Sequence, residues 1–215
     1  MPALIYALDD EIKPFLKKNR GGSPLLLCRC GIGMGNAHEA TENLIDTHHP
    51  DFIVSAGYAG GLREGLKSGD IVLPTEIRCE SPDRFQPEPV LRDRLKNAIQ
   101  KLKLPFHEGA LLTVFNPLKL PEQKKEAGKK GAMAVDLETA AIAAVCSKKS
   151  VPFVALRVVF DPVEMEAPEF EPKKVIRNSF FRIPKLIRMN RRCQQHLAAV
   201  IGRFLVSQLR NFGEA

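Results

Sequence analysis

The chain has 215 residues, 44% hydrophobic and 27% charged, with a formal net charge of +7 at pH 7. These proportions are ordinary for a globular protein and exclude fibrous and low-complexity chains. No apolar run approaches the roughly 18 residues that span a bilayer, and MPALIYALDD (1–10) lacks the basic start of a secretory signal. We therefore expect one cytoplasmic domain over residues 1–215.

Short apolar runs alternate with stretches of helical spacing along the chain. Strands are predicted at 3–8, 25–30, 51–57, 69–77, 109–115 and 151–160, and helices at 36–48, 89–102 and 137–149. Strands separated by helices favour a parallel sheet covered on both faces. The predicted class is α/β, with three αβα layers around a central mixed, mostly parallel sheet. Ligands of such folds gather at the carboxyl ends of the strands.

The cysteines give no sign of a disulfide framework or a metal site. They are odd in number and scattered, at positions 28, 30, 79, 146 and 193. Cys28 and Cys30 lack the C-x-x-C spacing and the second pair of a structural zinc site. We expect buried thiols, no metal and no organic cofactor.

The stretch RCGIGMGNAHEA (29–40) has glycines at 31, 33 and 35 between a predicted strand and a predicted helix. The third glycine comes one position early for the dinucleotide fingerprint G-x-G-x-x-G, and Asp51 precedes its strand instead of ending it. Two interpretations remain open. The loop is either a tight turn for close packing, or a cradle of N–H groups facing an anion or sugar hydroxyls.

Four further motifs lie at predicted strand ends: ALDDE (7–11), SAGYAGGL (55–62), AVDLETAAIAAVC (134–146) and LRVVFDP (156–162). Together with the glycine loop, their order and spacing resemble the nucleoside phosphorylase and nucleosidase superfamily, over roughly residues 3–162. Within it, the motifs are most similar to those of 5′-methylthioadenosine/S-adenosylhomocysteine nucleosidases. The resemblance implies cleavage of the N-glycosidic bond of a purine nucleoside.

Asp161 ends the longest apolar strand, where partial desolvation should raise the pKa of its carboxyl. The resemblance implies that Asp161 gives a proton to N7 of the purine. A strand-end or helix-capping aspartate is the alternative. Two departures from the family pattern adjoin it: Phe160 replaces the usual serine, and Pro162 stiffens the turn.

Two glutamates complete the implied chemistry. Glu11, the third acid of ALDDE, stands where the nucleosidases carry the base that activates water, whereas Asp9 and Asp10 are expected to be solvated or capping. Glu138, in VDLE, can accept hydrogen bonds from both ribose hydroxyls, or else is a first-turn glutamate favoured by the helix dipole. Leu137 replaces the usual methionine and keeps an apolar contact with the sugar.

The remaining substrate-binding predictions also follow from the resemblance. Phe115 lies where the family places an aromatic ring on the purine, with a core role as the alternative. Gly57 and Tyr58 are expected next to the substrate, where Tyr58 replaces a usual serine or threonine. Gly33 would face sugar and water. Arg157 is either near the nucleophile side of the pocket or part of a structural ion pair.

Hydrolysis is predicted over phosphorolysis. The hexameric phosphorylases of this superfamily grip phosphate with an arginine after the first strand and another in an R-x-G-S turn. This chain has ALDDE (7–11) and SAGYAGG (55–61) at those places, and an acid in the first loop would repel phosphate. The alternatives are a phosphate-dependent purine nucleoside phosphorylase and, outside enzymes, a nucleoside-binding module.

The C-terminal part is strongly basic. Residues 173–213 hold ten of the 32 Lys and Arg residues and no Asp or Glu, which leaves 22 basic and 25 acidic residues elsewhere. Eight of the ten lie in the appendage 173–192, where Ile176, Phe180, Ile183 and Ile187 form a helical stripe that Pro184 interrupts. The pattern suits an anionic membrane surface, or a helix packed on its own domain with a solvated basic face.

The nucleoside itself is predicted from two features. The segment between DIVLPTEI (70–77) and LRDRL (91–95) is short, which leaves the 5′ side of the pocket open. With the basic appendage, this resembles hopanoid-associated phosphorylases and implies a lipid-linked nucleoside such as adenosylhopane. No recognised nucleic-acid motif accompanies the basic charge, so no nucleic-acid partner is expected. The superfamily implies a homodimer or larger oligomer, peripheral to the membrane if the appendage binds lipid.

Overall fold

The structure, a computed structural model, describes residues 1–19, 25–167 and 183–212. Its strands are β1 (Ala3–Tyr6), β2 (Leu26–Arg29), β3 (Ile53–Gly61), β4 (Ile71–Arg78), β5 (Arg84–Phe85), β6 (Phe106–Thr113), β7 (Ala132–Asp136) and β8 (Phe153–Asp161). Its helices are α1 (Lys13–Lys18), α2 (Met34–His48), α3 (Pro89–Lys101), α4 (Pro121–Lys129), α5 (Thr139–Lys148) and α7 (Ile183–Phe212).

The described strands form one mixed, mostly parallel sheet, as the sequence predicts. The order is β2-β1-β3-β7-β6-β4-β5, and β8 pairs with both β3 and β4. The β1–β2, β1–β3, β3–β8, β4–β6 and β6–β7 pairs are parallel, whereas β3–β7, β4–β8 and β4–β5 are antiparallel. The pairs β3–β8–β4–β6–β7–β3 close into a ring, which curls one end of the sheet around a small apolar cluster.

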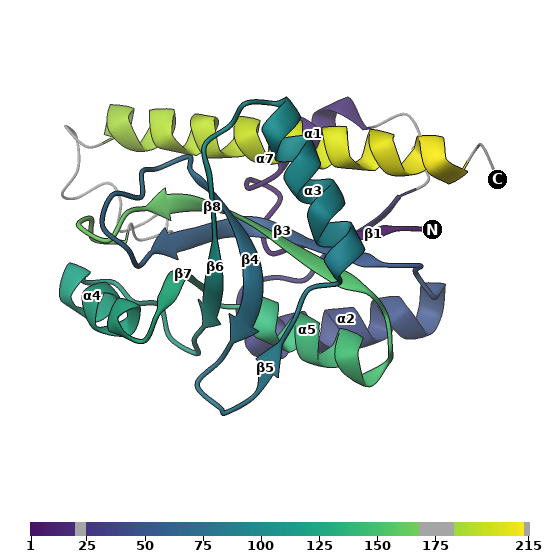
Figure 1. The fold of residues 1–215 in the computed structure, drawn as a ribbon, viewed down its shortest axis with the longest axis horizontal. Helices are drawn as coiled ribbons and strands as arrows, with labels where there is room; N and C mark the ends of the chain where they lie inside the picture. Colours follow the sequence, from purple (N-terminus) through teal and green to yellow (C-terminus); the bar gives the residue numbers. More distant parts are fainter. Residues whose placement is uncertain (20–24, 168–182, 213–215) are drawn as a thin grey trace.

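Helices cover both faces of the sheet, which confirms the predicted three layers. Helices α1, α3 and α7 lie over one face, and α2 and α5 over the other (Figure 1). β8 is buried along its whole length, so it is the central apolar strand that its composition predicts. Asp161, at its carboxyl end, is thereby held against a rigid part of the core.

Several short elements were not predicted from the sequence. α1, α4 and β5 are missing from the predicted set because each is short or follows a polar run without clear periodicity. β7 was implied by the motif AVDLE at its end but was given no bounds. The strand predicted at 109–115 ends at Thr113 and begins earlier, at Phe106. The consequence for the site is that Phe115 lies in the loop after β6 rather than in the strand.

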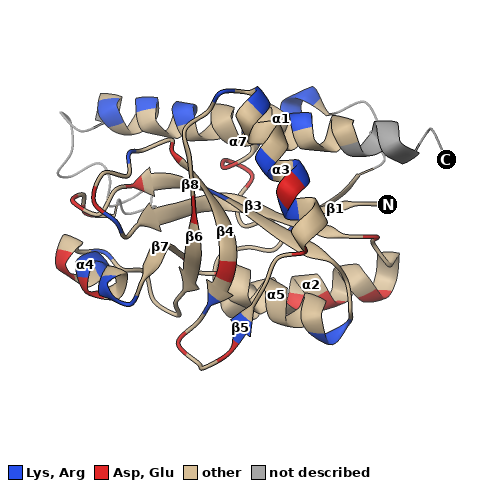
Figure 2. Cartoon of the chain, viewed as in Figure 1, with Lys and Arg blue, Asp and Glu red and all other residues tan. Residues whose placement is uncertain are grey.

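Helix α7 is continuous from Ile183, because Pro184 falls in its first turn, where proline is tolerated. Its inner face packs on the domain through Cys193, Leu197 and Phe204, which are fully buried. Lys185, Arg188 and Arg191 are exposed on its outer face, and blue Lys and Arg positions recur along the helix in Figure 2. Residues 173–182 of the predicted basic appendage, with Ile176 and Phe180, lie outside the described residues. Within the described part, no helix combines the length and apolar character needed to cross a membrane.

Candidate active site

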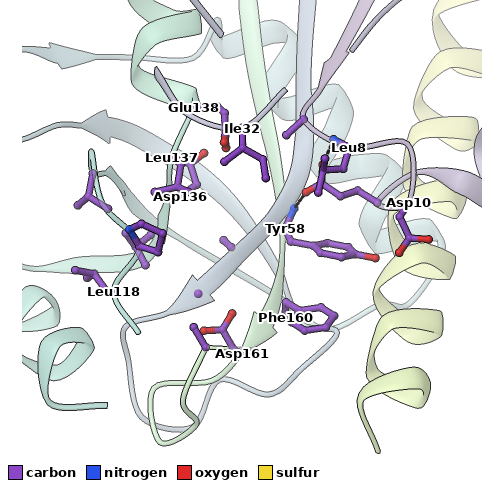
Figure 3. A pocket seen from close by; sticks show the side chains of 18 residues that line it. Leu8, Asp10, Ile32, Tyr58, Leu118, Asp136, Leu137, Glu138, Phe160 and Asp161 are labelled. Atoms are coloured by element: carbon purple, nitrogen blue, oxygen red, sulfur yellow. Dashed lines mark hydrogen bonds between the residues drawn. The ribbon is translucent and has the colours of Figure 1, made fainter. Parts of the chain in front are cut away.

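A cavity of about 200 Å³ opens where β1, β3, β7 and β8 end. Five of its lining residues are acids: Asp10, Glu11, Asp136, Glu138 and Asp161 (Figure 3). The rest of the lining is largely apolar, and no lysine or arginine lines this cavity among the described residues. Of these acids, Glu11, Glu138 and Asp161 were predicted from the sequence as site residues, and the fold brings them together. Asp10, which was expected to be solvated or capping, and Asp136 were not predicted there.

Glu11 lies in the loop between β1 and α1, with 7% of its surface exposed. One carboxylate oxygen accepts a hydrogen bond from the backbone N–H of Tyr58 (2.8 Å), and the other accepts one from Leu8 (3.0 Å). Burial raises the pKa of Glu11, and the two N–H donors oppose that rise by favouring the ionised form. The two N–H donors therefore fix the carboxylate in place, while burial makes it a stronger base than an exposed glutamate.

Gly57 makes room for Glu11 instead of lining the main cavity. A Cβ at this position would lie 2.9 Å from a carboxylate oxygen of Glu11, closer than real Cβ contacts. The structure therefore gives Gly57 a packing role next to the carboxylate, behind the surface on which a substrate would rest.

The glycine loop is tied to Glu138. Gly31 and Gly33 have positive φ angles of 80° and 95°, which other residues rarely adopt. The N–H of Gly33 donates to the Glu138 carboxylate over 2.8 Å. Burial first, and then the neighbouring Asp136, raise the pKa of Glu138 to about 7. Near neutral pH this carboxyl can accept hydrogen bonds from hydroxyl groups or donate to them. Leu137 lines the cavity beside it.

Arg157 lies beneath the cavity, 3% exposed, and does not line it. Its guanidinium donates to Asp136 (2.9 Å), Ser55 (2.9 Å) and Thr139 (2.5 Å). Of the two interpretations of the sequence, the structure favours the structural ion pair. Because Asp136 and Thr139 flank Leu137 and Glu138, the pair fixes the β7–α5 junction that presents them.

Tyr58 and Phe160 form an aromatic wall of the cavity. Their rings stack with centroids 5.1 Å apart and planes at 22°. The Tyr58 hydroxyl donates to Asn190 of α7 over 2.6 Å, and Asn190 donates in turn to Asp10 over 2.8 Å. Two of the departures from the family pattern, Tyr58 and Phe160, are therefore neighbours, and α7 anchors Tyr58.

Phe115 is 68% exposed and is not among the residues that line the cavity. The apolar wall on that side comes from Val114, Pro117 and Leu118. The described conformation thus gives no support to stacking of Phe115 on a purine, nor to its alternative role in the core.

Asp161 is 7% exposed, lines the cavity and forms an ion pair with Lys124, which is fully buried on α4. Burial raises the pKa of Asp161, and the Lys124 ammonium opposes that rise. Lys124 was not singled out in the sequence, because KKEAGKK (124–130) is typical of a solvated helix. No local signal in the sequence separates Lys124 from the exposed Lys125.

The sequence of this chain matches a known protein family over most of its length. The phosphorylase superfamily profile matches residues 12–180. The chain is 31% identical over 166 residues to the 5′-methylthioadenosine/S-adenosylhomocysteine nucleosidase of Shewanella loihica, covering 68% of this chain and 72% of that protein. It is 30% identical over 187 residues to the Exiguobacterium enzyme of the same name, covering 76% and 79%.

Solved structures show the same fold. The nucleosidase of Neisseria meningitidis, solved with methylthio-immucillin-A, superposes with a TM-score of 0.80 at 23% identity, over 96% of this chain and 98% of that one. Futalosine hydrolase of Helicobacter pylori superposes with a TM-score of 0.80 at 17% identity, over 96% and 97%. The sequence profile and the identity to the curated nucleosidases confirm the resemblance that the motifs predicted, and the chain belongs to the phosphorylase superfamily.

Proposed function

We propose that this protein hydrolyses the N-glycosidic bond of adenine nucleosides. The proposal rests on one observation: Glu11 and Asp161, which are distant in sequence, line the same cavity as Glu138. The curated relatives named as nucleosidases support the same reaction class.

The roles follow from the environment of each carboxyl. Asp161, whose pKa burial raises against the opposing charge of Lys124, donates a proton to N7, so that adenine leaves as a neutral base. Glu138 accepts hydrogen bonds from the ribose hydroxyls and favours positive charge on the sugar. Glu11 takes a proton from a water molecule while the oxygen of that water forms a bond to the anomeric carbon of the sugar. The C–N bond breaks, a C–O bond forms, and the products are adenine and the free sugar.

Water is favoured over phosphate by the charge of the cavity. Its lining holds five acids, of which Asp161 and Asp136 are paired from behind with Lys124 and Arg157. Among the described residues no lysine or arginine lines the cavity, so it presents no cation that could grip a phosphate dianion. The Gly33 N–H, which could otherwise cradle an anion, already binds Glu138. Both observations support the hydrolysis predicted from the sequence.

We expect adenine release from 5′-methylthioadenosine in phosphate-free buffer, at a rate that added phosphate does not raise. Chromatography would quantify adenine and identify the sugar product. Strict dependence on phosphate, with a sugar 1-phosphate as product, would show a phosphorylase. Binding of adenosine without any turnover would instead support the nucleoside-binding module.

The lining of the cavity also bears on the group attached to the 5′ carbon of the sugar. Leu8, Ile32, Tyr58 and Phe160 give the cavity apolar walls, which suits an apolar substituent. A lipid-linked nucleoside such as adenosylhopane stays a prediction from the sequence, as does a homodimer. Comparing kcat/KM for 5′-methylthioadenosine, S-adenosylhomocysteine and a long-chain 5′-alkyl adenosine tests the first, and light scattering tests the second.

We also propose that the outer face of α7 binds anionic membranes. Lys185, Arg188 and Arg191 are exposed there, beside Ile187, which is 46% exposed. Helix α1 packs next to α7 and adds exposed lysines, so the basic charge spreads over one face of the molecule (Figure 2). Charge and apolar side chains together are what an anionic lipid surface attracts.

The full chain should cosediment with phosphatidylserine vesicles at low salt, and less so at high salt. Each cation contributes roughly 1 kcal/mol, so the triple variant Lys185→Gln, Arg188→Gln, Arg191→Gln should bind about 100-fold more weakly. The matched control is Lys125→Gln, Lys129→Gln, Lys130→Gln, which removes three exposed lysines in and beside α4. No sedimentation, or equal losses in both triple variants, would end this proposal.

A further inference from the structure

Lys124 is the buried charged group that the proposed mechanism leaves unused. Its side chain is 0% exposed, although α4 is otherwise a largely polar helix at the surface. An isolated buried ammonium is strongly destabilising, so such a residue persists only where its partners compensate for the loss of water. The partners of Lys124 therefore indicate what the residue does.

All the partners of Lys124 belong to the end of β8 and the turn that follows. The ammonium forms an ion pair with the Asp161 carboxylate and donates to the carbonyl oxygens of Pro162 (3.2 Å) and Met165 (2.7 Å). Met165 N–H also donates to Pro162, which closes the turn. A lysine has three N–H donors, and here they hold one carboxylate and the backbone behind it.

Helix α4 brings Lys124 to this place through close backbone packing. Gly128 lies one turn further along the same face, and a Cβ there would overlap the carbonyl oxygen of Leu62, just after β3. Pro121 opens the helix, and the Gln123 side chain accepts hydrogen bonds from the N–H groups of Lys119 and Leu120 at its start. The position of Lys124 is thus set by the fold and does not depend on a flexible side chain reaching inward.

We infer that Lys124 is a positioning residue, which holds the Asp161 carboxyl and its turn in the geometry that proton transfer to the purine requires. The inference rests on the proposed function, because it assigns Lys124 a role through Asp161. Gly60 supports the same geometry, since a Cβ there would lie 3.3 Å from an Asp161 oxygen.

Lys124 also sets the charge around Asp161. The other titratable groups that face the cavity with Asp161 are the acids Asp10, Glu11, Asp136 and Glu138, and the Cys193 thiol of α7 lies near its carboxyl. Among the described residues, Lys124 is the cation that lies against Asp161, and it opposes the rise in pKa that burial causes. Loss of Lys124 should therefore raise the pKa of Asp161 further.

The test compares Lys124→Met with Lys125→Met, which removes an exposed lysine from the same helix. ¹³C NMR titration follows the Asp161 carboxyl, assigned by its absence in Asp161→Asn. We expect its pKa to rise by roughly 1 to 3 units in Lys124→Met and to stay unchanged in Lys125→Met. In adenine release, kcat should fall about 100-fold with little change in KM, and the alkaline limb of kcat/KM should move to higher pH.

Two results would overturn the inference: an unchanged Asp161 titration in folded Lys124→Met, or a fall in rate with an unshifted pH profile, as a purely structural role would give. The titration needs no turnover, so it decides the inference even if the wild type releases no adenine, a result that would count against the proposed function alone.

If Lys124→Met does not fold, the titration is done on Lys124→Gln, which keeps a donor for the carbonyls. If neither folds, the double variant Lys124→Met, Asp161→Asn decides: a folded double variant supports a role directed at the Asp161 charge, whereas an unfolded one identifies Lys124 as structural and overturns the inference.

Discussion

We expect Asp161→Asn to release adenine roughly 100- to 10,000-fold more slowly than the wild type, the range that general acid catalysis contributes. The amide keeps the shape of the carboxyl and its place in the cavity but has no acidic proton for N7. KM should change little, because the binding of the sugar by Glu138 is retained. The loss should therefore lie in kcat, measured by chromatography of adenine.

The pH profile of the wild type should carry the signature of Asp161. A general acid works in its protonated form, so the rate falls as the pH rises through the pKa of that acid. Since burial raises the pKa of Asp161, the alkaline limb should lie above the ordinary range of an aspartate.

A substrate with a better leaving group separates proton donation from general damage. 4-Nitrophenyl riboside releases a phenolate that needs no protonation, so Asp161→Asn should cleave it at nearly the wild-type rate. The substitution also leaves the Lys124 ammonium without its counterion, so rates are normalised to the folded fraction from circular dichroism. Equal losses on both substrates in folded protein would show that Asp161 is not the proton donor.

The parts of the fold and site that the sequence revealed were those with local patterns. β8 is a long apolar run that ends in an acid, and the glycines at 31 and 33 stand where the structure shows positive φ angles. Glu11 and Glu138 each follow a strand, and strand ends converge in α/β folds, so their meeting with Asp161 could be expected.

The parts that the sequence did not reveal depend on contacts between distant segments. Nothing local distinguishes Lys124 from Lys125, because the difference arises where Gly128 meets the backbone near the end of β3. Tyr58 was expected beside the substrate, but its bond to Asn190 joins β3 to a helix at the other end of the chain. The role of Phe115 was predicted from the family resemblance, but Phe115 lies exposed in the loop after β6. The strand predicted at 109–115 runs two residues beyond the end of β6, an error typical at element boundaries.

Glu11→Gln should also lower kcat by roughly 100- to 10,000-fold, because a neutral amide cannot take the proton from the attacking water. The base works ionised, so the wild-type rate should fall as the pH drops through the pKa of Glu11. Burial raises that pKa, so the acid limb should lie above the ordinary range of a glutamate. In Glu11→Gln that limb should disappear, and the small residual rate should no longer depend on pH there.

Asp9→Asn is the matched control, because Asp9 belongs to the same acidic run but is exposed and pairs with Arg29 over 3.3 Å. It should keep the wild-type rate and both limbs of the pH profile.

Azide provides a second test of Glu11, since azide attacks a sugar without losing a proton and so needs no base. In Glu11→Ala, where the lost side chain leaves space, azide should restore adenine release and form the glycosyl azide. Failure of azide in folded Glu11→Ala, while adenine still binds, would place the function of Glu11 in the structure of the loop rather than in the activation of water.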